Sequence, residues 1–313
     1  TICISRLAEG MQNPKRLAGL HFFNPVPQMP PIEAILQQYV LGDHDLGVEK
    51  AAADIAKASG KHIFWALDLP GFVVNGIWVP AIRVAVEEIE RGASFEEMDK
   101  AFRTGKWVDH PPARKVVEEL IKSAKMILEK QEKQNCGFKI AKENIDKLLE
   151  LGTKMPVGPF KLNALLEKGE AQNIRFELGP AQFIDLVGID VALDCIKSMA
   201  RQEPDRGWKE PELLLKMRED KTLGKKTGKG FYEYGSKVEI DYPEQGYARV
   251  RFGDGKRNVL ALDIVVKLTK AFLELKNRED LHAIFLEGFG EIFSQGANIE
   301  EFPLCLKDEN NAY

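Results

Sequence analysis

Two hydrophobic periods alternate along the chain, and each predicts a different kind of element. Short apolar runs predict three buried strands, at Gly19–Phe23, Ile32–Gln37 and Lys61–Ala66. The alanine-rich segment Gly47–Ser59 lies between the last two and predicts a helix that ends at Gly60. A short helix with Ser5 as its N-cap is expected near the N-terminus. Strands that alternate with a helix favour an α/β sheet.

In the next part of the sequence, the apolar residues have the spacing of helices. An apolar face with intervals of three and four residues predicts a helix over Ile77, Trp78, Ile82, Ala85, Val86 and Ile89. Ser94 followed by Glu97 has the spacing of a capping box at the start of a further helix. Residues 115–151 are rich in Lys and Glu around an apolar stripe, which is typical of a solvated helical face. After residue 234 the pattern predicts a strand, a helix and a strand, at Tyr247–Phe252, Ala261–Asn277 and Ile284–Glu287.

The segment Gly19–Glu33 combines a rigid backbone with three polar side chains. Its four prolines exclude a helix, so His21, Asn24 and Glu33 are held on a strand and a turn. A histidine that faces a cleft can transfer a proton, and a carboxylate on the next strand can select its tautomer. Taken alone, a histidine beside two phenylalanines also fits a core or turn position.

The run HFFNPVP, followed by a Glu twelve positions after the His, resembles the active-site segment of the L-3-hydroxyacyl-CoA dehydrogenases. The resemblance implies that His21 is the general acid/base, that Glu33 is its partner and that Asn24 contacts the substrate. The stretch DLPGFVVN is similar to the domain junction of the same family, whose asparagine reaches the active site, and this implies a substrate role for Asn75. The family usually has Arg at the position of Gly76, and Asn75 alone also fits a helix cap.

Two further stretches resemble the helical C-terminal domain of that family. They are LGPAQFIDLVGID, at residues 178–190, and GKKTGKGFYEY, at residues 224–234. A second Gly-Pro turn, MPVGPF at residues 155–160, lies in an inserted segment, residues 102–177, that the family pattern does not explain. Read as a basic glycine loop, residues 224–230 lack the spacing of a Walker phosphate site.

The strand–helix–strand pattern that ends in FSQGANIEEF, residues 293–302, resembles the opening of a crotonase (enoyl-CoA hydratase) domain. The resemblance implies that the backbone N–H of Ala297 donates to a thioester oxygen and stabilises an enolate. Without the preceding units, the same stretch reads as a plain glycine turn. The second oxyanion donor and the catalytic carboxylates of that family are expected after residue 313.

Composition and charge exclude several classes of function. The net charge of the 313 residues is −4, so there is no electrostatic reason to expect nucleic acid or a membrane as a partner. No secretory signal or membrane-spanning apolar stretch is evident. The four cysteines are scattered, without metal-ligand spacing, which fits reduced thiols in a cytoplasmic protein and predicts no metal site.

The predicted fold class is α/β plus all-α, in three parts. Residues 1–67 are expected to be the C-terminal part of an NAD-binding, Rossmann-like domain. Residues 68–235 are expected to be a helical dehydrogenase C-terminal domain that carries the inserted segment. Residues 241–313 are expected to be the opening β/α units of a crotonase fold.

The resemblance implies NAD-dependent oxidation of an (S)-3-hydroxyacyl-CoA to a 3-oxoacyl-CoA, within a bifunctional fatty-acid-oxidation enzyme that also hydrates enoyl-CoA. The sequence contains no Gly-x-Gly-x-x-Gly turn, so we expect most of the dinucleotide site, and the activity, to need residues outside this chain. The partners implied are an acyl-CoA thioester and a second copy, as a homodimer through the helical domain. The alternative is a non-catalytic acyl-CoA-binding or dimerisation module. A different NAD-dependent hydroxy-acid dehydrogenase fits less well, because HFFNP with the later Glu is not expected there.

Overall fold

The computed structural model describes residues 2–24, 26–36, 46–133, 140–235, 237–255 and 257–298. Contacts within the chain divide it into two compact units, Thr1–Tyr232 and Glu233–Tyr313. Several expected features lie outside the described residues, namely Pro25, Cys136, Cys305 and residues 299–302. The described cysteines, Cys3 and Cys195, are free thiols.

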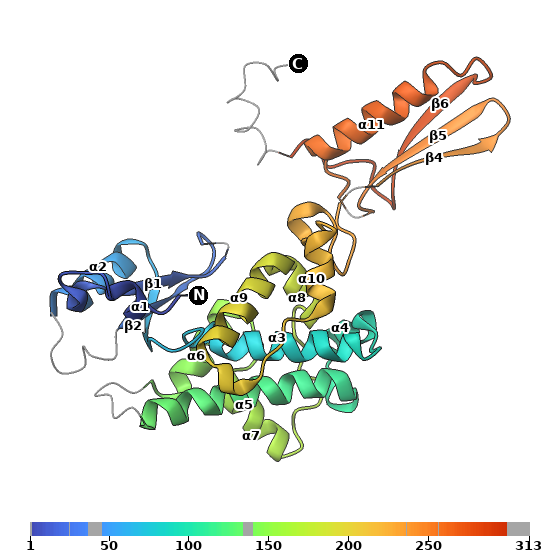
Figure 1. The fold of residues 1–313 in the computed structure, drawn as a ribbon. Coiled ribbons are helices and arrows are strands. Elements are labelled where there is room, and N and C mark those ends of the chain that lie inside the picture. Colours follow the sequence, from blue (N-terminus) through green and yellow to red (C-terminus); the bar gives the residue numbers. More distant parts are fainter. Residues whose placement is uncertain are drawn as a thin grey trace. The chain divides into compact units, whose positions relative to one another are not determined.

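A three-stranded sheet, drawn in blue in Figure 1, opens the first unit. Its strands are β1 (Gly19–Phe22), β2 (Pro31–Leu36) and β3 (His62–Leu67), and α2 (Leu46–Ala58) lies between the last two in the chain. β1 pairs antiparallel with β2, and β2 pairs parallel with β3. All six residues of β2 are buried, which explains why its sequence is apolar except for Glu33. The predicted strands and helix are confirmed.

The short helix near the N-terminus is capped differently from the prediction. α1 (Ile4–Ala8) begins after Cys3 and contains Ser5, so the prediction of Ser5 as its N-cap is wrong. The backbone N–H groups of Ile4 and Ser5 donate to the two carboxylate oxygens of Asp68, each at 2.7 Å. The capping group therefore comes from the end of β3, which no local pattern in the sequence reveals.

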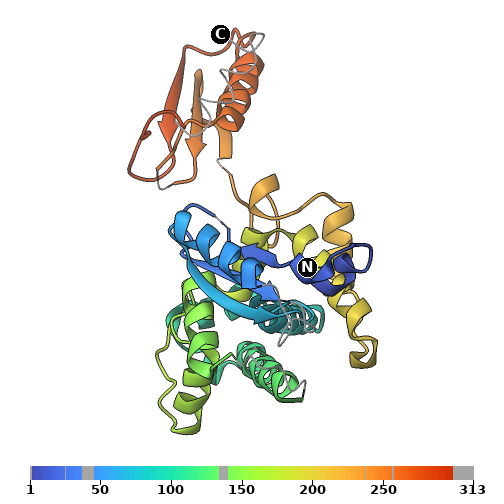
Figure 2. The same cartoon turned by 90° about the vertical axis from the view of Figure 1, so that its left-hand side faces the viewer.

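The rest of the first unit is helical. Its helices are α3 (Val74–Glu90), α4 (Phe95–Thr104), α5 (Pro111–Lys133), α6 (Lys142–Thr153), α7 (Pro159–Glu167), α8 (Pro180–Val187), α9 (Ile189–Gln202) and α10 (Glu212–Glu219). Single 3-10 turns lie at Pro14–Arg16, Trp107–Asp109, Pro204–Arg206 and Lys225–Thr227. α3 and α5 pack along each other, and α5 and α7 lie at the lower end of this unit in Figures 1 and 2. No helix in the described part of the chain has the length and apolar character that a membrane crossing requires.

Two predictions about helix starts have different outcomes. Ser94 caps α4, and its Oγ accepts the N–H of Glu97 at 3.1 Å, so this prediction is confirmed. The N-cap of α3 is Val73, so the alternative interpretation of Asn75 as a capping residue is wrong. Asn75 instead lies in the first turn of the helix.

Gly76 marks the place where the inserted segment packs on α3. A Cβ atom at this position would lie 3.1 Å from Ile127 Cδ1 of α5. α5 therefore fills the space beside position 76. This packing gives a physical reason for a glycine where the family pattern has a long, charged arginine.

The duplicated Gly-Pro turn also has a structural explanation. Gly179-Pro180 leads into α8, and Asp99 of α4 accepts the N–H groups of the next two residues at 3.0 and 2.9 Å. Gly158-Pro159 leads into α7, and Asp146 of α6 accepts the N–H groups of the next two residues at 2.8 and 3.1 Å. The pair α6–α7 thus repeats the pair α4–α8, and the inserted segment carries its own copy of one helical motif.

The glycine-rich ending of the first unit closes on Asp185 of α8. The backbone N–H groups of Phe231 and Tyr232 donate to its two carboxylate oxygens, each at 2.9 Å. A Cβ at Gly230 would lie 2.0 Å from Asp185 Oδ1, so only glycine fits this approach. The Tyr232 hydroxyl donates to Asp99 at 3.0 Å, which ties the ending to the motif described above.

The second unit holds a smaller sheet in the order β4-β5-β6. β4 (Lys237–Glu244) pairs antiparallel with β5 (Tyr247–Gly253), and β5 pairs parallel with β6 (Ala283–Gly288). Helix α11 (Leu262–Leu275) connects β5 and β6 in the chain. The predicted strands and helix are confirmed, whereas β4 was not predicted. Its charged and partly exposed residues make a weak hydrophobic signal, and cross-strand pairs such as Arg249 with Asp241 at 2.7 Å stabilise it.

Candidate active site

His21 and Glu33 face each other across neighbouring strands. They are directly opposite in the antiparallel register of β1 and β2, so their side chains lie on the same face of the sheet. His21 Nδ1 lies 2.6 Å from Glu33 Oε2. The histidine side chain is 28% exposed and the glutamate side chain 0%. The structure thus brings these two predicted residues together and leaves one side of the imidazole open.

The second oxygen of Glu33 binds the start of α3. Oε1 accepts the backbone N–H of Val73 at 3.0 Å and that of Val74 at 3.1 Å. A buried carboxylate is costly unless donors surround it, and the positive end of a helix dipole stabilises its negative charge. These contacts fix Glu33 in one orientation toward His21.

This geometry selects the histidine tautomer. An ionised carboxylate only accepts hydrogen bonds, so the proton of the neutral imidazole is on Nδ1 and donates to Glu33. The lone pair is then on Nε2, the nitrogen that faces away from the carboxylate. Such a pair can take a proton from a hydroxyl group and hold the resulting cation beside a negative charge.

Two phenylalanine rings frame the imidazole. The ring centroid of His21 lies 5.1 Å from that of Phe23 and 5.6 Å from that of Phe72, both in edge contacts. Phe72 has φ of +54°, an uncommon backbone conformation for a bulky residue. Gly71 precedes it, and a Cβ there would lie 2.6 Å from the backbone nitrogen of Gly76. This tight turn delivers both Phe72 and the start of α3 to the His–Glu pair.

The two predicted asparagines lie on segments that flank this pair. Asn75 is adjacent to Val74, whose N–H binds Glu33. Asn24 is exposed, three residues beyond His21, and lines a cavity of about 110 Å³ together with Trp78. The substrate-binding roles of Asn24 and Asn75 stay predictions.

Sequence reasoning missed two contributors to this site. It did not find the backbone donors Val73 and Val74, although the DLPGFVVN stretch that contains them was singled out. It also missed the walls of the cavity, because these come from segments far apart in the chain. No group of His, Cys, Asp or Glu side chains that could hold a metal ion occurs among the residues that the structure describes.

Ala297, the remaining predicted site residue, belongs to the second unit. It faces Leu260 in an isolated parallel bridge, in which the N–H of Leu260 donates to Gly296 and the N–H of Asn298 donates to Leu260. In this pairing the N–H of Ala297 itself points away from Leu260. The direction suits a donor to a ligand oxygen, and the role of Ala297 stays a prediction.

Comparison with known families identifies two segments of the chain. Residues 1–61 match the model of the 3-hydroxyacyl-CoA dehydrogenase NAD binding domain. Residues 169–234 match the model of the 3-hydroxyacyl-CoA dehydrogenase C-terminal domain. The cofactor named for the first of these domains is NAD, as the resemblance implied.

Similar proteins include two groups of dehydrogenases. The mitochondrial hydroxyacyl-coenzyme A dehydrogenase of Mus musculus is 27% identical over 74% of this chain and 51% of its own length. A 3-hydroxybutyryl-CoA dehydrogenase of Mycobacterium tuberculosis is 26% identical over 75% of this chain and 57% of its own length. The chain therefore spans about half the length of the curated relatives that it matches.

Among solved structures, the (S)-3-hydroxybutyryl-CoA dehydrogenase of Ralstonia eutropha is 24% identical, with a TM-score of 0.47, over 75% of this chain and 58% of that one. The 3-hydroxybutyryl-CoA dehydrogenase of Escherichia coli is 17% identical, with a TM-score of 0.47, over 94% of this chain and 57% of that one. On the two domain matches, residues 1–61 and 169–234 are similar to the NAD-binding and the C-terminal domain of the 3-hydroxyacyl-CoA dehydrogenases, respectively.

Proposed function

We propose that the protein carrying this chain oxidises an (S)-3-hydroxyacyl-CoA to the 3-oxoacyl-CoA. The observation that supports this most directly is the His21–Glu33 pair, anchored on the start of α3. His21 Nε2 takes the proton of the C3 hydroxyl, and Glu33 stabilises the imidazolium that forms. NAD supplies the acceptor for the hydride that leaves C3. The printed sequence has no glycine-rich dinucleotide turn, so this chain's contribution is proton transfer and substrate orientation.

The test uses the complete protein that contains these residues. Acetoacetyl-CoA reduction is followed by NADH absorbance for the wild type and for His21→Ala. A general acid/base contributes roughly 10² to 10⁴ in rate, so we expect kcat to fall by that factor. Near-normal turnover of His21→Ala would overturn the assignment.

A non-catalytic acyl-CoA-binding module is the second candidate. The observation in its favour is that the sequence contains no Gly-x-Gly-x-x-Gly turn for the phosphates of a dinucleotide. Titration of this chain with NADH and, separately, with acetoacetyl-CoA distinguishes the two. Binding of the thioester without binding of NADH supports the module, and turnover by the complete protein contradicts it.

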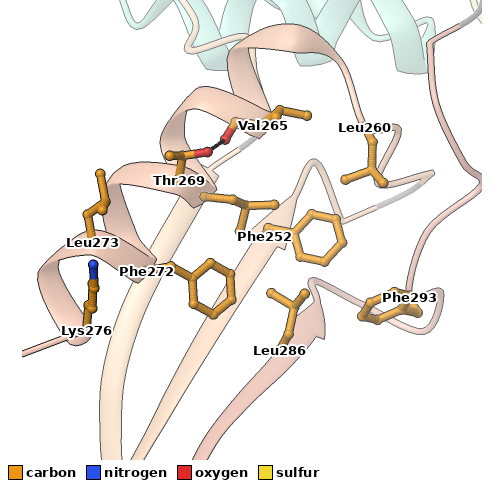
Figure 3. Close-up of a pocket in the computed structure, with 10 residues that line it drawn as sticks. Phe252, Leu260, Val265, Thr269, Phe272, Leu273, Lys276, Leu286 and Phe293 are labelled. Atoms are coloured by element: carbon orange, nitrogen blue, oxygen red, sulfur yellow. Dashed lines mark hydrogen bonds between the residues drawn. The ribbon is translucent and has the colours of Figure 1, made fainter. Parts of the chain in front are cut away.

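We further propose that the second unit opens a crotonase-type domain. The observations that support this are the β5–α11–β6 unit with parallel strands and the outward N–H of Ala297. α11 and the sheet also leave an apolar groove of about 610 Å³, lined by Phe252, Phe272 and Phe293 among others (Figure 3). Ala297→Pro removes the N–H, while Ala297→Ser keeps it. Loss of crotonyl-CoA hydration by the complete protein in the first variant alone is the expected result.

The homodimer through the helical domain is also a proposal. It is supported by apolar side chains that lie exposed where α8 meets α9, such as Val187 and Val191, which are 38% and 41% exposed. Sedimentation of wild type and of Val187→Asp tests it. A dimer that dissociates in the variant is expected, and a monomeric wild type contradicts the proposal.

A further inference from the structure

The cavity beside Asn24 is built from three separate parts of the first unit. The β1–β2 connection contributes Asn24 and Met29, and helices α3 and α8 contribute Trp78, Phe183 and Leu186. The remaining walls come from the inserted segment and its end, at Gly152, Thr153, Lys154, Met155, Phe176, Glu177 and Leu178. Apolar side chains and methylene groups dominate this lining, which is typical of a site for an apolar ligand.

The cavity lies next to the His21–Glu33 pair. Phe23, whose ring contacts His21, also packs on Gly152, since a Cβ there would lie 3.2 Å from the Phe23 ring. On α3, Trp78 follows Asn75 by three residues, so both lie on the same face of the helix. Contacts within one unit therefore connect the imidazole to the wall of the cavity.

Trp78 gives the cavity a rigid apolar wall. Its side chain is 6% exposed, and its ring stacks on that of Phe183 with a centroid distance of 4.6 Å. An aromatic wall that is held in place in this way suits an apolar group of a ligand.

We propose that this cavity holds the acyl tail of the substrate, and that Met155 of the inserted segment and Phe183 of α8 set the length of the tail. The inference rests on the proposed dehydrogenase function, since it places the substrate's C3 at His21. The tail beyond C3 then runs past Asn24 and between Trp78 and Met155.

The volume of the cavity limits the tail to a short chain. A cavity of roughly 150 Å³ holds a benzene molecule, so about 110 Å³ holds about four carbon atoms. The rim carries one charge of each sign, Lys154 and Glu177, which lie 3.5 Å apart. These charges offset each other, so the rim does not attract an acyl tail that ends in a charged group. The substrate class is a short, unbranched, uncharged 3-hydroxyacyl-CoA.

The first experiment measures binding and needs no turnover. The complete protein is titrated with free CoA and with the 3-hydroxybutyryl, hexanoyl, octanoyl and dodecanoyl thioesters, followed by calorimetry and by Trp fluorescence. Each buried methylene strengthens binding by about fourfold, so affinity should rise from butyryl to hexanoyl and stay level from octanoyl onward.

Variants of the cavity walls sharpen the test. Phe183→Ala and Met155→Ala enlarge the cavity, so the affinity should keep rising to a longer acyl chain before it levels off. Leu186→Trp narrows the cavity and should strengthen binding of the butyryl thioester relative to the longer ones. Leu186 is 54% exposed, so this substitution leaves the core intact. The matched control is Phe160→Ala on α7, which removes a ring of the inserted segment outside the cavity and should leave the series unchanged.

Two results would overturn the inference. Affinity that does not vary with chain length would assign the cavity to the pantetheine arm or to no part of the ligand. Equal shifts in Phe183→Ala and in Phe160→Ala would show a general loss of structure. Either result leaves the loss of turnover in His21→Ala untouched, so failure of this inference and failure of the proposed function are separate outcomes.

Discussion

Asp99 and Asp146 occupy the same place in two copies of one helical motif. Each carboxylate accepts two backbone N–H groups from the first turn of a helix that follows a Gly-Pro pair. Each is also buried against the glycine of that pair, since a Cβ at Gly179 or at Gly158 would lie 2.3 Å from the Cα of its aspartate. The inserted segment is thus folded by the same contact as the helical pair that surrounds it.

Asp99 should make stability depend on pH. Burial raises its pKa from 3.8 to about 6, although Ala181, Gln182 and Tyr232 donate hydrogen bonds to it. The folded chain then holds a proton between these values that the unfolded chain has lost. The free energy of unfolding should therefore fall as pH rises from about 4 to about 6, by up to about 3 kcal/mol. Urea unfolding of the wild type and of Asp99→Asn across this range measures it, and parallel curves would contradict the prediction.

Gly179 should not tolerate a methyl group. Gly179→Ala would force the backbone of α4 away from α8, and overpacking of this kind costs about 1 to 3 kcal/mol or more. Thermal unfolding measures the loss. Gly10→Ala is the matched control, because nothing lies within 4 Å of a Cβ at that position, and its melting temperature should stay close to that of the wild type.

Glu33→Gln should inactivate the proposed dehydrogenase while it keeps the packing. The amide N–H of glutamine would donate to His21 Nδ1, so the imidazole proton would move to Nε2 and the base would be lost. We expect kcat to fall by about 10² to 10⁴. In a His21→Ala background the same change should cost almost nothing further, because the two residues act as one unit. Additive losses in the double variant would refute the coupling.

Asp68, and not Ser5, should stabilise the N-terminal helix. Asp68→Ala removes the acceptor for the N–H groups of Ile4 and Ser5, at an expected cost of about 1 to 2 kcal/mol. Ser5→Ala leaves that contact in place and should be nearly neutral. Chemical unfolding of the two variants compares them directly, and the opposite ranking would restore Ser5 as the cap.

Local patterns were enough where the interacting residues are close in the chain. The strands around His21, the cap at Ser94 and the apolar face of α3 follow from spacing over one or two turns or one strand pair. β4 was not predicted because its charged residues pair with residues of β5, so the strand has little hydrophobic signal of its own.

The sequence alone determined the chemical inventory of this protein: a histidine on a strand that cannot become a helix, a glutamate on the next strand and two asparagines beside them. Tertiary structure decided what holds these groups. The amides of Val73 and Val74 reach Glu33 only because the Pro-Gly turn directs α3 at the sheet. Likewise, Met155 and Trp78 line one cavity only because Asp146 repeats the contact of Asp99 and folds the inserted segment beside α3. Contacts between distant segments depend on the packing of whole helices, which the local hydrophobic period does not encode.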